Sequence, residues 1–268
     1  MRLPLATESP RPEVPAGSPG SPGFTGGGAA DAHAEPQRIV NWALRRFRHR
    51  SLVVTTGFGM EGCAMLDMLA STGESIDVHW IDTGFLFAET HELRDRLAAR
   101  YSRLRFVRHE PDLTPEEQAR VHGPELWTRD PDRCCGLRKV EPMRRILGGA
   151  DAWMTAVRRE QSDTRAATEA VAWDPGFELV KISPLAGWSR EQVWEHVRRW
   201  QVPHNVLHER GYPSLGCIQC TAPVAGSRPE DYSRQGRWLG HEKTECGLHL
   251  RMPSAVARPE DHRHSSPI

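Results

Sequence analysis

Hydrophobic and polar positions follow two different periods along most of the chain. Short runs of β-branched and aromatic residues predict strands, and longer stretches with apolar residues three and four positions apart predict helices. Helices are expected near residues 36–48, 60–70, 88–100, 114–121, 134–147 and 189–200. Strands are expected near 51–55, 77–81, 104–108, 152–156 and 179–182. This alternation predicts an α/β protein with a doubly wound, mostly parallel sheet, in which ligands bind at the carboxyl ends of the strands.

The two ends of the chain lack any such pattern. Residues 1–35 are rich in Pro, Gly, Ser and Ala and are predicted to form a disordered extension, and the polar residues 251–268 a disordered tail. Residues 36–250 are expected to form the one folded domain. From about residue 203 onward the sequence of this domain has no regular hydrophobic period, although this segment holds three of the six cysteines. An irregular C-terminal segment, held by something other than a hydrophobic core, is therefore expected.

One glycine-rich stretch, TTGFGMEG at residues 55–62, lies between a predicted strand and a predicted helix. Backbone N–H groups at the start of a helix and the positive end of its dipole favour an anion there. Gly57, Gly59 and Gly62 also spell the dinucleotide-binding pattern, and Asp82 follows the next strand, where a dehydrogenase would bind ribose. The local sequence thus leaves open a nicotinamide cofactor, another nucleotide, or a tight turn without a ligand.

Composition and charge bear on the binding partners of the protein and on its cellular compartment. The 268 residues carry a formal net charge of zero, which gives no reason to expect nucleic acid as a partner. No apolar run approaches the roughly 18 residues of a membrane span, and the N-terminus lacks the apolar core of a signal peptide. A cytoplasmic protein with no membrane partner is expected, in which the six cysteines do not form structural disulfides.

Four of the cysteines form two close pairs. Cys134 and Cys135 are adjacent, and Cys217 and Cys220 have C-x-x-C spacing. Adjacent residues on a helix point about 100° apart, which suits a single tetrahedral zinc poorly. An iron–sulfur cube is more tolerant, because each thiolate binds a different iron. Together with the family resemblance described below, this geometry favours a [4Fe–4S] cluster over zinc, and buried cysteines without a metal are a further alternative.

Cys246 is left over near the end of the chain, whereas Cys63 falls in an apolar helix pattern and is expected in the core. A thiol close to cations has a lowered pKa and can act as a nucleophile. An incidental exposed thiol is the alternative, since nothing in the surrounding sequence fixes Cys246 in place. Cationic residues recur near the cysteines and the expected ligand-facing loops: Lys139, Arg165, Arg234, Arg237 and Lys243. Together they indicate a doubly anionic group bound beside a thiol.

Eight segments in order carry a family resemblance from about residue 38 to 250. They are TTGFGMEG, WIDTGFLFAET, CCGLRKVEPM, RREQSDTRA, KISPLAGWS, GYPSLGCIQCTAP, GRW and KTECGLH. The chain resembles the assimilatory adenosine 5′-phosphosulfate reductases within the phosphoadenosine phosphosulfate reductase family. The resemblance implies an adenine-nucleotide α-hydrolase-like fold with a modified P-loop and an irregular, cluster-bound C-terminal segment, rather than a dinucleotide fold.

The resemblance also implies roles for individual residues. Cys246 matches the catalytic cysteine of the family, and the two cysteine pairs match the ligands of its [4Fe–4S] cluster. The modified P-loop would hold the α-phosphate of the substrate, the turn after the second strand would lie on the adenosine side, and the cations would surround the phosphosulfate. The substrate-binding residues expected on this basis are Thr55, Thr56, Gly57, Gly59, Glu61, Gly62, Asp82, Thr83, Gly84, Lys139, Arg165, Arg234 and Arg237.

The implied reaction is reduction of adenosine 5′-phosphosulfate to sulfite and AMP through an S-sulfocysteine on Cys246, with a thioredoxin-type reductant. Two departures from the family pattern, Gly57 in place of a frequent serine and Ala156 in place of the usual glycine, bear on substrate affinity. Two rival functions are a related sulfurtransferase or ATP-pyrophosphatase acting on RNA or DNA, and a non-catalytic metal-stabilised module. The sequence leaves open a homo-oligomer, the identity of the reductant and use of the 3′-phosphorylated substrate.

Overall fold

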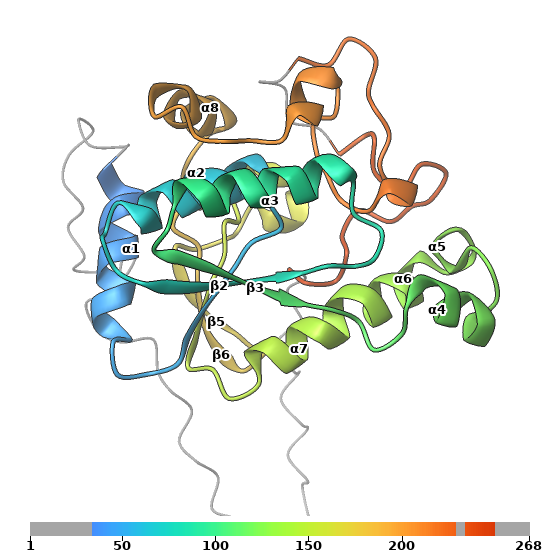
Figure 1. The fold of residues 1–268 in the computed structure, drawn as a ribbon, viewed down its shortest axis with the longest axis horizontal. Coiled ribbons are helices and arrows are strands. Elements are labelled where there is room, and N and C mark those ends of the chain that lie inside the picture. Colours follow the sequence, from blue (N-terminus) through green and yellow to red (C-terminus); the bar gives the residue numbers. More distant parts are fainter. Residues whose placement is uncertain (1–33, 229–233, 250–268) are drawn as a thin grey trace, which may run out of the picture.

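A six-stranded sheet forms the centre of the protein in the computed structural model, which describes residues 34–228 and 234–249 (Figure 1). The strand order is β3-β2-β1-β4-β6-β5. All neighbours pair in parallel except β5 and β6, which are antiparallel. The strands are β1 (Leu52–Thr55), β2 (Ile76–Ile81), β3 (Leu104–His109), β4 (Ala152–Met154), β5 (Val171–Asp174) and β6 (Leu179–Ile182).

All five predicted strands are present, and β5 is a further strand that the sequence pattern did not predict. The helices are α1 (Ala34–Arg46), α2 (Met60–Ala70), α3 (Ala88–Arg100), α4 (Pro115–His122), α5 (Leu126–Arg129), α6 (Pro131–Cys135), α7 (Glu141–Leu147) and α8 (Arg190–Arg199). Capping boxes form at Thr114 before α4 and at Ser189 before α8. The predictions for the disordered ends concern residues outside the described part of the chain, except that α1 already begins at Ala34.

Two hydrophobic cores lie on opposite faces of the sheet. The larger one packs α1, α2, α3 and α8 against one face and includes Phe58, Met65, Leu93 and Trp194. The smaller one packs α7 against the other face through Met143 and Leu147. Figure 1 shows α2 and α3 above the sheet and α7 below it. Helices on both faces leave the carboxyl ends of the parallel strands as the open edge where a ligand can bind.

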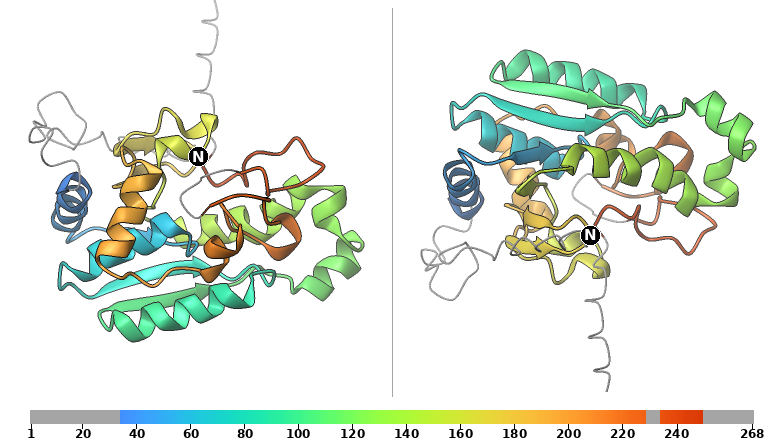
Figure 2. Two further views of the ribbon diagram at one scale, coloured as in Figure 1. Left: turned by 90° about the horizontal axis from the view of Figure 1, so that it is seen from above. Right: turned by 90° about the horizontal axis from the view of Figure 1, so that it is seen from below.

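The chain after α8 is irregular, as the sequence predicts. Within the described residues it contains two short 3₁₀ turns, Val206–Arg210 and Ile218–Cys220, and otherwise loops. An isolated bridge between Leu86 and Cys217 joins it to the segment after β2. Figure 2 shows it beside the α4–α6 region, where Lys243 pairs with Asp132. Among the helices of the described chain, none has the length and hydrophobicity needed to cross a membrane.

Candidate active site

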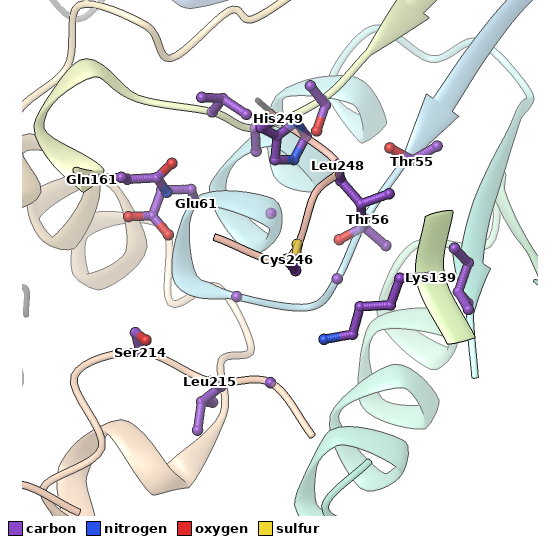
Figure 3. A pocket seen from close by; sticks show the side chains of 18 of the residues that line it. Thr55, Thr56, Glu61, Lys139, Gln161, Ser214, Leu215, Cys246, Leu248 and His249 are labelled. Carbon is purple, nitrogen blue, oxygen red and sulfur yellow. The ribbon is translucent and has the colours of Figure 1, made fainter. Parts of the chain in front are cut away.

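A cavity of about 260 Å³ opens at the carboxyl end of the parallel strands. Its walls come from the loop after β1, the end of β2, the segment after β4 and the irregular C-terminal segment. Figure 3 shows side chains from these distant parts of the sequence around one space. The residues expected at the site that line this cavity are Thr55, Thr56, Gly57, Gly59, Glu61, Gly62, Thr83, Lys139, Arg165, Arg234, Arg237, Cys217 and Cys246.

The glycine-rich loop between β1 and α2 has the local geometry of an anion site. Phe58 adopts a left-handed conformation at φ 57°, and its N–H donates to the Thr56 hydroxyl at 3.1 Å. Gly59 caps α2 without a side-chain hydrogen bond, and residues 59–62 at the start of this helix line the cavity. A Cβ on Gly62 would lie 2.6 Å from Thr56 Oγ1, so this position requires glycine. A Cβ on Gly57 would meet no heavy atom within 4 Å, so a serine would fit there.

Glu61, in the first turn of α2, is part of a buried charge cluster beneath this loop. Its Oε1 accepts hydrogen bonds from Arg158 Nε at 3.0 Å, Arg158 Nη2 at 2.9 Å and Arg190 Nη1 at 3.2 Å. Burial alone would raise the pKa of Glu61, but Arg190 and Arg158 outweigh burial and lower it to about 2. Two arginines thus neutralise the carboxylate, and its contacts fix the start of the helix against the loop after β4.

The turn after β2 contains three residues that were predicted to bind substrate, Asp82, Thr83 and Gly84, and the structure gives them different surroundings. Of these, only Thr83 lines the main cavity formed by the described residues. Asp82 accepts the Gly84 N–H at 3.0 Å, and its other oxygen pairs with Arg108 at 2.7 Å. Gly84 adopts φ 71°, and a Cβ there would lie 2.9 Å from the Pro115 ring. Asp82 and Gly84 therefore shape the turn that presents Thr83.

Cys246 lies in the wall of the cavity and is partly exposed. Burial would raise the pKa of its thiol, but the Lys139 ammonium, the Leu248 N–H and Arg165 together lower it. Burial would lower the pKa of Lys139, but the negative charges of the Cys217, Cys135 and Cys246 thiolates outweigh burial and raise it. Figure 3 shows Cys246 near Thr56 and Lys139. In contrast, burial raises the pKa of the core thiol Cys63 to about 12, as suits its predicted core position.

Lys139 owes its position to an unusual helix. The helix predicted over 134–147 is present as α6 and α7, with a π-helical turn, Gly136–Val140, between them. Such wide turns within a helix are rare and occur frequently at functional sites. This turn places Lys139 in the walls of both the main cavity and the neighbouring cavity that the paired cysteines line.

The four paired cysteines surround that second, smaller cavity. Cys134 and Cys135 end α6. Cys217 directly precedes the 3₁₀ turn at residues 218–220, and Cys220 is its last residue; all four cysteines line the cavity. Burial and the neighbouring Cys135 thiol raise the pKa of Cys134 to about 11. The Thr83 hydroxyl lies 3.4 Å from the sulfur of Cys217. The tertiary structure therefore brings together two cysteine pairs that are 82 residues apart in the sequence.

Four thiols around one cavity are a donor set that fits a metal–sulfur site. Within the described residues, no three His, Cys, Asp or Glu side chains converge on a point where one metal ion could bind. The sulfurs instead face a shared space whose other walls include Phe85, Trp127 and the cationic residues Arg138 and Lys139. Gln118 Nε2 donates to the Cys134 sulfur at 3.8 Å. Thiolates that bind separate irons need not converge on one point, and nearby cations can balance their charge.

Two functional candidates, Glu245 and His249, were missed in the sequence. The carboxylate of Glu245 pairs with Arg165 at 2.7 Å. His249 lines the main cavity and stacks on Trp153, with ring centroids 5.2 Å apart. Both residues lie in the quoted segment KTECGLH, but no local signal distinguishes them, because their partners are about 80 and 96 residues away.

Comparison with known proteins decides the family. Residues 51–223 match the phosphoadenosine phosphosulfate reductase domain. The chain belongs to this family. It is 44% identical over 212 residues to an adenosine 5′-phosphosulfate reductase of Geobacillus thermodenitrificans, covering 79% of this chain and 88% of that relative. It is also 44% identical over 214 residues to a reductase of the same name from Salinibacter ruber, and this match covers 80% of this chain and 83% of that relative.

Solved structures agree on the fold. The phosphoadenylyl-sulfate reductase of Candida auris, solved as a phosphate complex, has a TM-score of 0.61 and 32% identity, and the match covers 71% of this chain and 90% of that one. The FMN adenylyltransferase of Candida glabrata, at 14% identity, has a TM-score of 0.53 over 73% of this chain and 66% of that one, which shows a shared fold alone. Membership of the reductase family confirms the resemblance stated above and excludes the nicotinamide-dehydrogenase alternative.

Proposed function

We propose that this protein is an adenosine 5′-phosphosulfate reductase of assimilatory sulfate reduction, which reduces its substrate to sulfite and AMP. The observation that carries the proposal is the position of Cys246, whose thiol has a lowered pKa and lies in the same cavity as the glycine-rich loop and Lys139. The relatives from Geobacillus and Salinibacter bear this name at 44% identity, whereas the structurally matched phosphoadenylyl-sulfate reductase is 32% identical.

The first half-reaction transfers the sulfonate group to the protein. The α-phosphate of the nucleotide lies against the helix-start N–H groups of the glycine-rich loop and the hydroxyls of Thr55 and Thr56. The Cys246 thiolate attacks the sulfur of the sulfate group, the bond from that sulfur to the bridging oxygen breaks, and AMP leaves with the electron pair. The product on the protein is an S-sulfocysteine.

Cations stabilise the charge that develops on the leaving phosphate and on the sulfonate oxygens. Lys139, Arg234 and Arg237 line the same cavity as Cys246 and are proposed to stabilise this charge. Thr83 closes the cavity at the end of β2, held by Arg138, whose Nε donates to the Thr83 carbonyl at 2.7 Å. Asp82 and Gly84 contribute indirectly, by shaping this turn.

The second half-reaction releases sulfite. A thiolate of a reduced thioredoxin-type dithiol attacks the Cys246 sulfur and displaces sulfite, and the second thiol of the reductant then frees Cys246. The reductant is oxidised to a disulfide, and the sulfur of the substrate gains those two electrons. Cys246 is therefore regenerated as a thiol at the end of each cycle.

A [4Fe–4S] cluster on Cys134, Cys135, Cys217 and Cys220 is proposed as the resident cofactor. When bound, it would supply a charged group next to the substrate cavity and a covalent link between α6 and the irregular C-terminal segment. The shared cavity of the four sulfurs and the hydrogen bond from Gln118 support this assignment.

The proposal is tested with anaerobically purified protein and reduced thioredoxin. AMP and sulfite are measured from adenosine 5′-phosphosulfate and, separately, from its 3′-phosphorylated form. The expected result is stoichiometric AMP and sulfite with a higher kcat/KM for the nucleotide without the 3′-phosphate. Absence of both products from both nucleotides would refute the reductase assignment, and a preference for the 3′-phosphorylated form would refute the substrate assignment.

A further inference from the structure

The ion pair between Glu245 and Arg165 lies beside the nucleophile but belongs neither to the phosphate loop nor to the cysteine site. Arg165 donates from Nε to Oε1 of Glu245 at 2.9 Å and from Nη2 to Oε2 at 2.7 Å. The hydroxyls of Ser162 and Thr164 lie 2.9 and 3.2 Å from Oε1. Oε2 also faces Arg234 at 3.5 Å. The loop after β4 thus holds both oxygens of the carboxylate.

This contact is shielded from water and carries full charge. Glu245 is 4% exposed and Arg165 is 8% exposed. Burial would raise the pKa of Glu245, but the hydrogen bonds and charge of Arg165, with Arg234 and Ser162, lower it. Bidentate arginine–carboxylate pairs fix geometry as well as energy, and loss of one partner of a buried pair is costly. The pair is therefore a strong attachment point in a segment without regular secondary structure.

A second attachment point lies on the other side of Cys246. The His249 ring stacks on Trp153 of β4 at an interplanar angle of 17°. Cys246 directly follows Glu245 and precedes His249 by three residues, so the chain is fixed on both sides of the nucleophile. Both partners belong to β4 or to the loop that follows it.

We propose that Glu245 is a positioning residue whose ion pair with Arg165 docks the C-terminal segment and holds the Cys246 thiol against the substrate cavity beside Lys139. The inference rests on the proposed reductase function. The step it serves is the attack of Cys246 on the sulfate sulfur, and Glu245 itself exchanges no atom, proton or electron. In this arrangement Arg165 acts on the reaction through Glu245, by fixing the nucleophile.

Glu245→Gln tests the proposal, because it keeps the size of the side chain and removes its charge. Glu242→Gln is the matched control, an exposed glutamate three residues earlier in the same segment. Two quantities are measured on holoenzyme: the dissociation constant of adenosine 5′-phosphosulfate, and the single-turnover rate of sulfonation of the Cys246 peptide, followed by mass spectrometry without reductant. Iron content and thermal midpoint are recorded for every variant.

Glu245→Gln should bind nucleotide as the wild type does but sulfonate Cys246 about 100-fold more slowly, since a misplacement of about 1 Å can cost that factor. Glu242→Gln should match the wild type in both measurements. Glu245→Asp, which restores the charge, should recover part of the rate. The double variant Ser162→Ala/Thr164→Val removes two neutral contacts to the carboxylate and should show a smaller loss of the sulfonation rate. It replaces Glu245→Gln as the test variant if Glu245→Gln does not fold.

Three results would overturn the inference. The first is sulfonation of Glu245→Gln at the wild-type rate. The second is tighter nucleotide binding without a loss of rate, which would mean that Glu245 competes with substrate for Arg165. The third is a parallel loss of binding, iron and rate, which would indicate a general structural role. Failure of the wild type itself to form S-sulfocysteine would instead refute the proposed function.

Discussion

The indole nitrogen of Trp153 donates a 2.7 Å hydrogen bond to the hydroxyl of Thr55, and so joins β4 to the residue at which the glycine-rich loop begins. Trp153 is fully buried, at 0% exposure, and its ring is also the surface on which His249 stacks. One side chain therefore contacts both the loop proposed to hold phosphate and the segment that carries Cys246.

Replacement of this tryptophan should reveal that link. Trp153→Phe keeps an aromatic ring but removes the donor to Thr55, so the free energy of unfolding should fall by about 1–3 kcal/mol. The midpoint of anaerobic urea unfolding measures this change, and isothermal titration should show weaker nucleotide binding. Trp200→Phe is the control, because Trp200 is 52% exposed, and its unfolding midpoint should stay at the wild-type value.

Cys246 should be the only site of covalent modification by substrate. Wild-type protein mixed with adenosine 5′-phosphosulfate without reductant should gain one SO₃ group, about 80 Da by its formula, on the peptide that contains Cys246. Cys246→Ser should still bind nucleotide but release no AMP, since serine does not supply a thiolate. The Cys63→Ala variant should still gain the SO₃ group on Cys246, because the buried Cys63 thiol, with its raised pKa, is not the nucleophile. Label on any other cysteine would contradict the assignment of the nucleophile.

The paired cysteines should bind a [4Fe–4S] cluster. Anaerobically purified protein should contain iron and acid-labile sulfide in equal amounts, about four of each per chain. Cys217→Ser should lower both and increase proteolysis within residues 203–225, because this irregular segment has little core of its own. Cys63→Ala should leave the iron content unchanged. Stoichiometric zinc without sulfide would exclude the cluster.

Acid should destabilise the protein through His208. Burial, together with the charge of Arg190, lowers the pKa of His208 from 6.5 to about 4. Between these two pKa values His208 is protonated in the unfolded chain and neutral in the folded protein. The stability that neutral His208 contributes is therefore complete above pH 6.5 and is lost as the pH falls to about 4. The loss is about 3 kcal/mol, from 1.4 kcal/mol per pKa unit.

The slope of stability against pH separates His208 from other acid-sensitive groups. His208→Asn retains a donor toward the Tyr212 carbonyl, which His208 Nδ1 contacts at 2.8 Å, and does not titrate. Urea unfolding between pH 7 and 4 should show a shallower decline for this variant, whatever its stability at neutral pH. The exposed His241→Asn should follow the wild type. An unchanged slope in His208→Asn would refute the role of His208.

Local sequence determined most of the secondary structure and the kind of site. Apolar periods located five strands and the longer helices, because these signals arise from neighbours within one or two turns. Glycine spacing located the loop that is proposed to hold phosphate, and the resemblance named the family. The unpredicted β5 pairs antiparallel at the edge of the sheet, and its sequence VAWD includes Ala and Asp, which are depleted in strands, so the local pattern does not distinguish it from a loop.

Tertiary structure alone decided which of these residues act together. It placed Thr83 in the cavity and Asp82 against Arg108, and it brought the two cysteine pairs to one space through a helix with a π turn. It also paired Glu245 with Arg165 and stacked His249 on Trp153, although the sequence indicated nothing that would hold Cys246. The physical reason is separation along the chain: these contacts join residues tens of positions apart, and their geometry exists only once the sheet has ordered the segments between them.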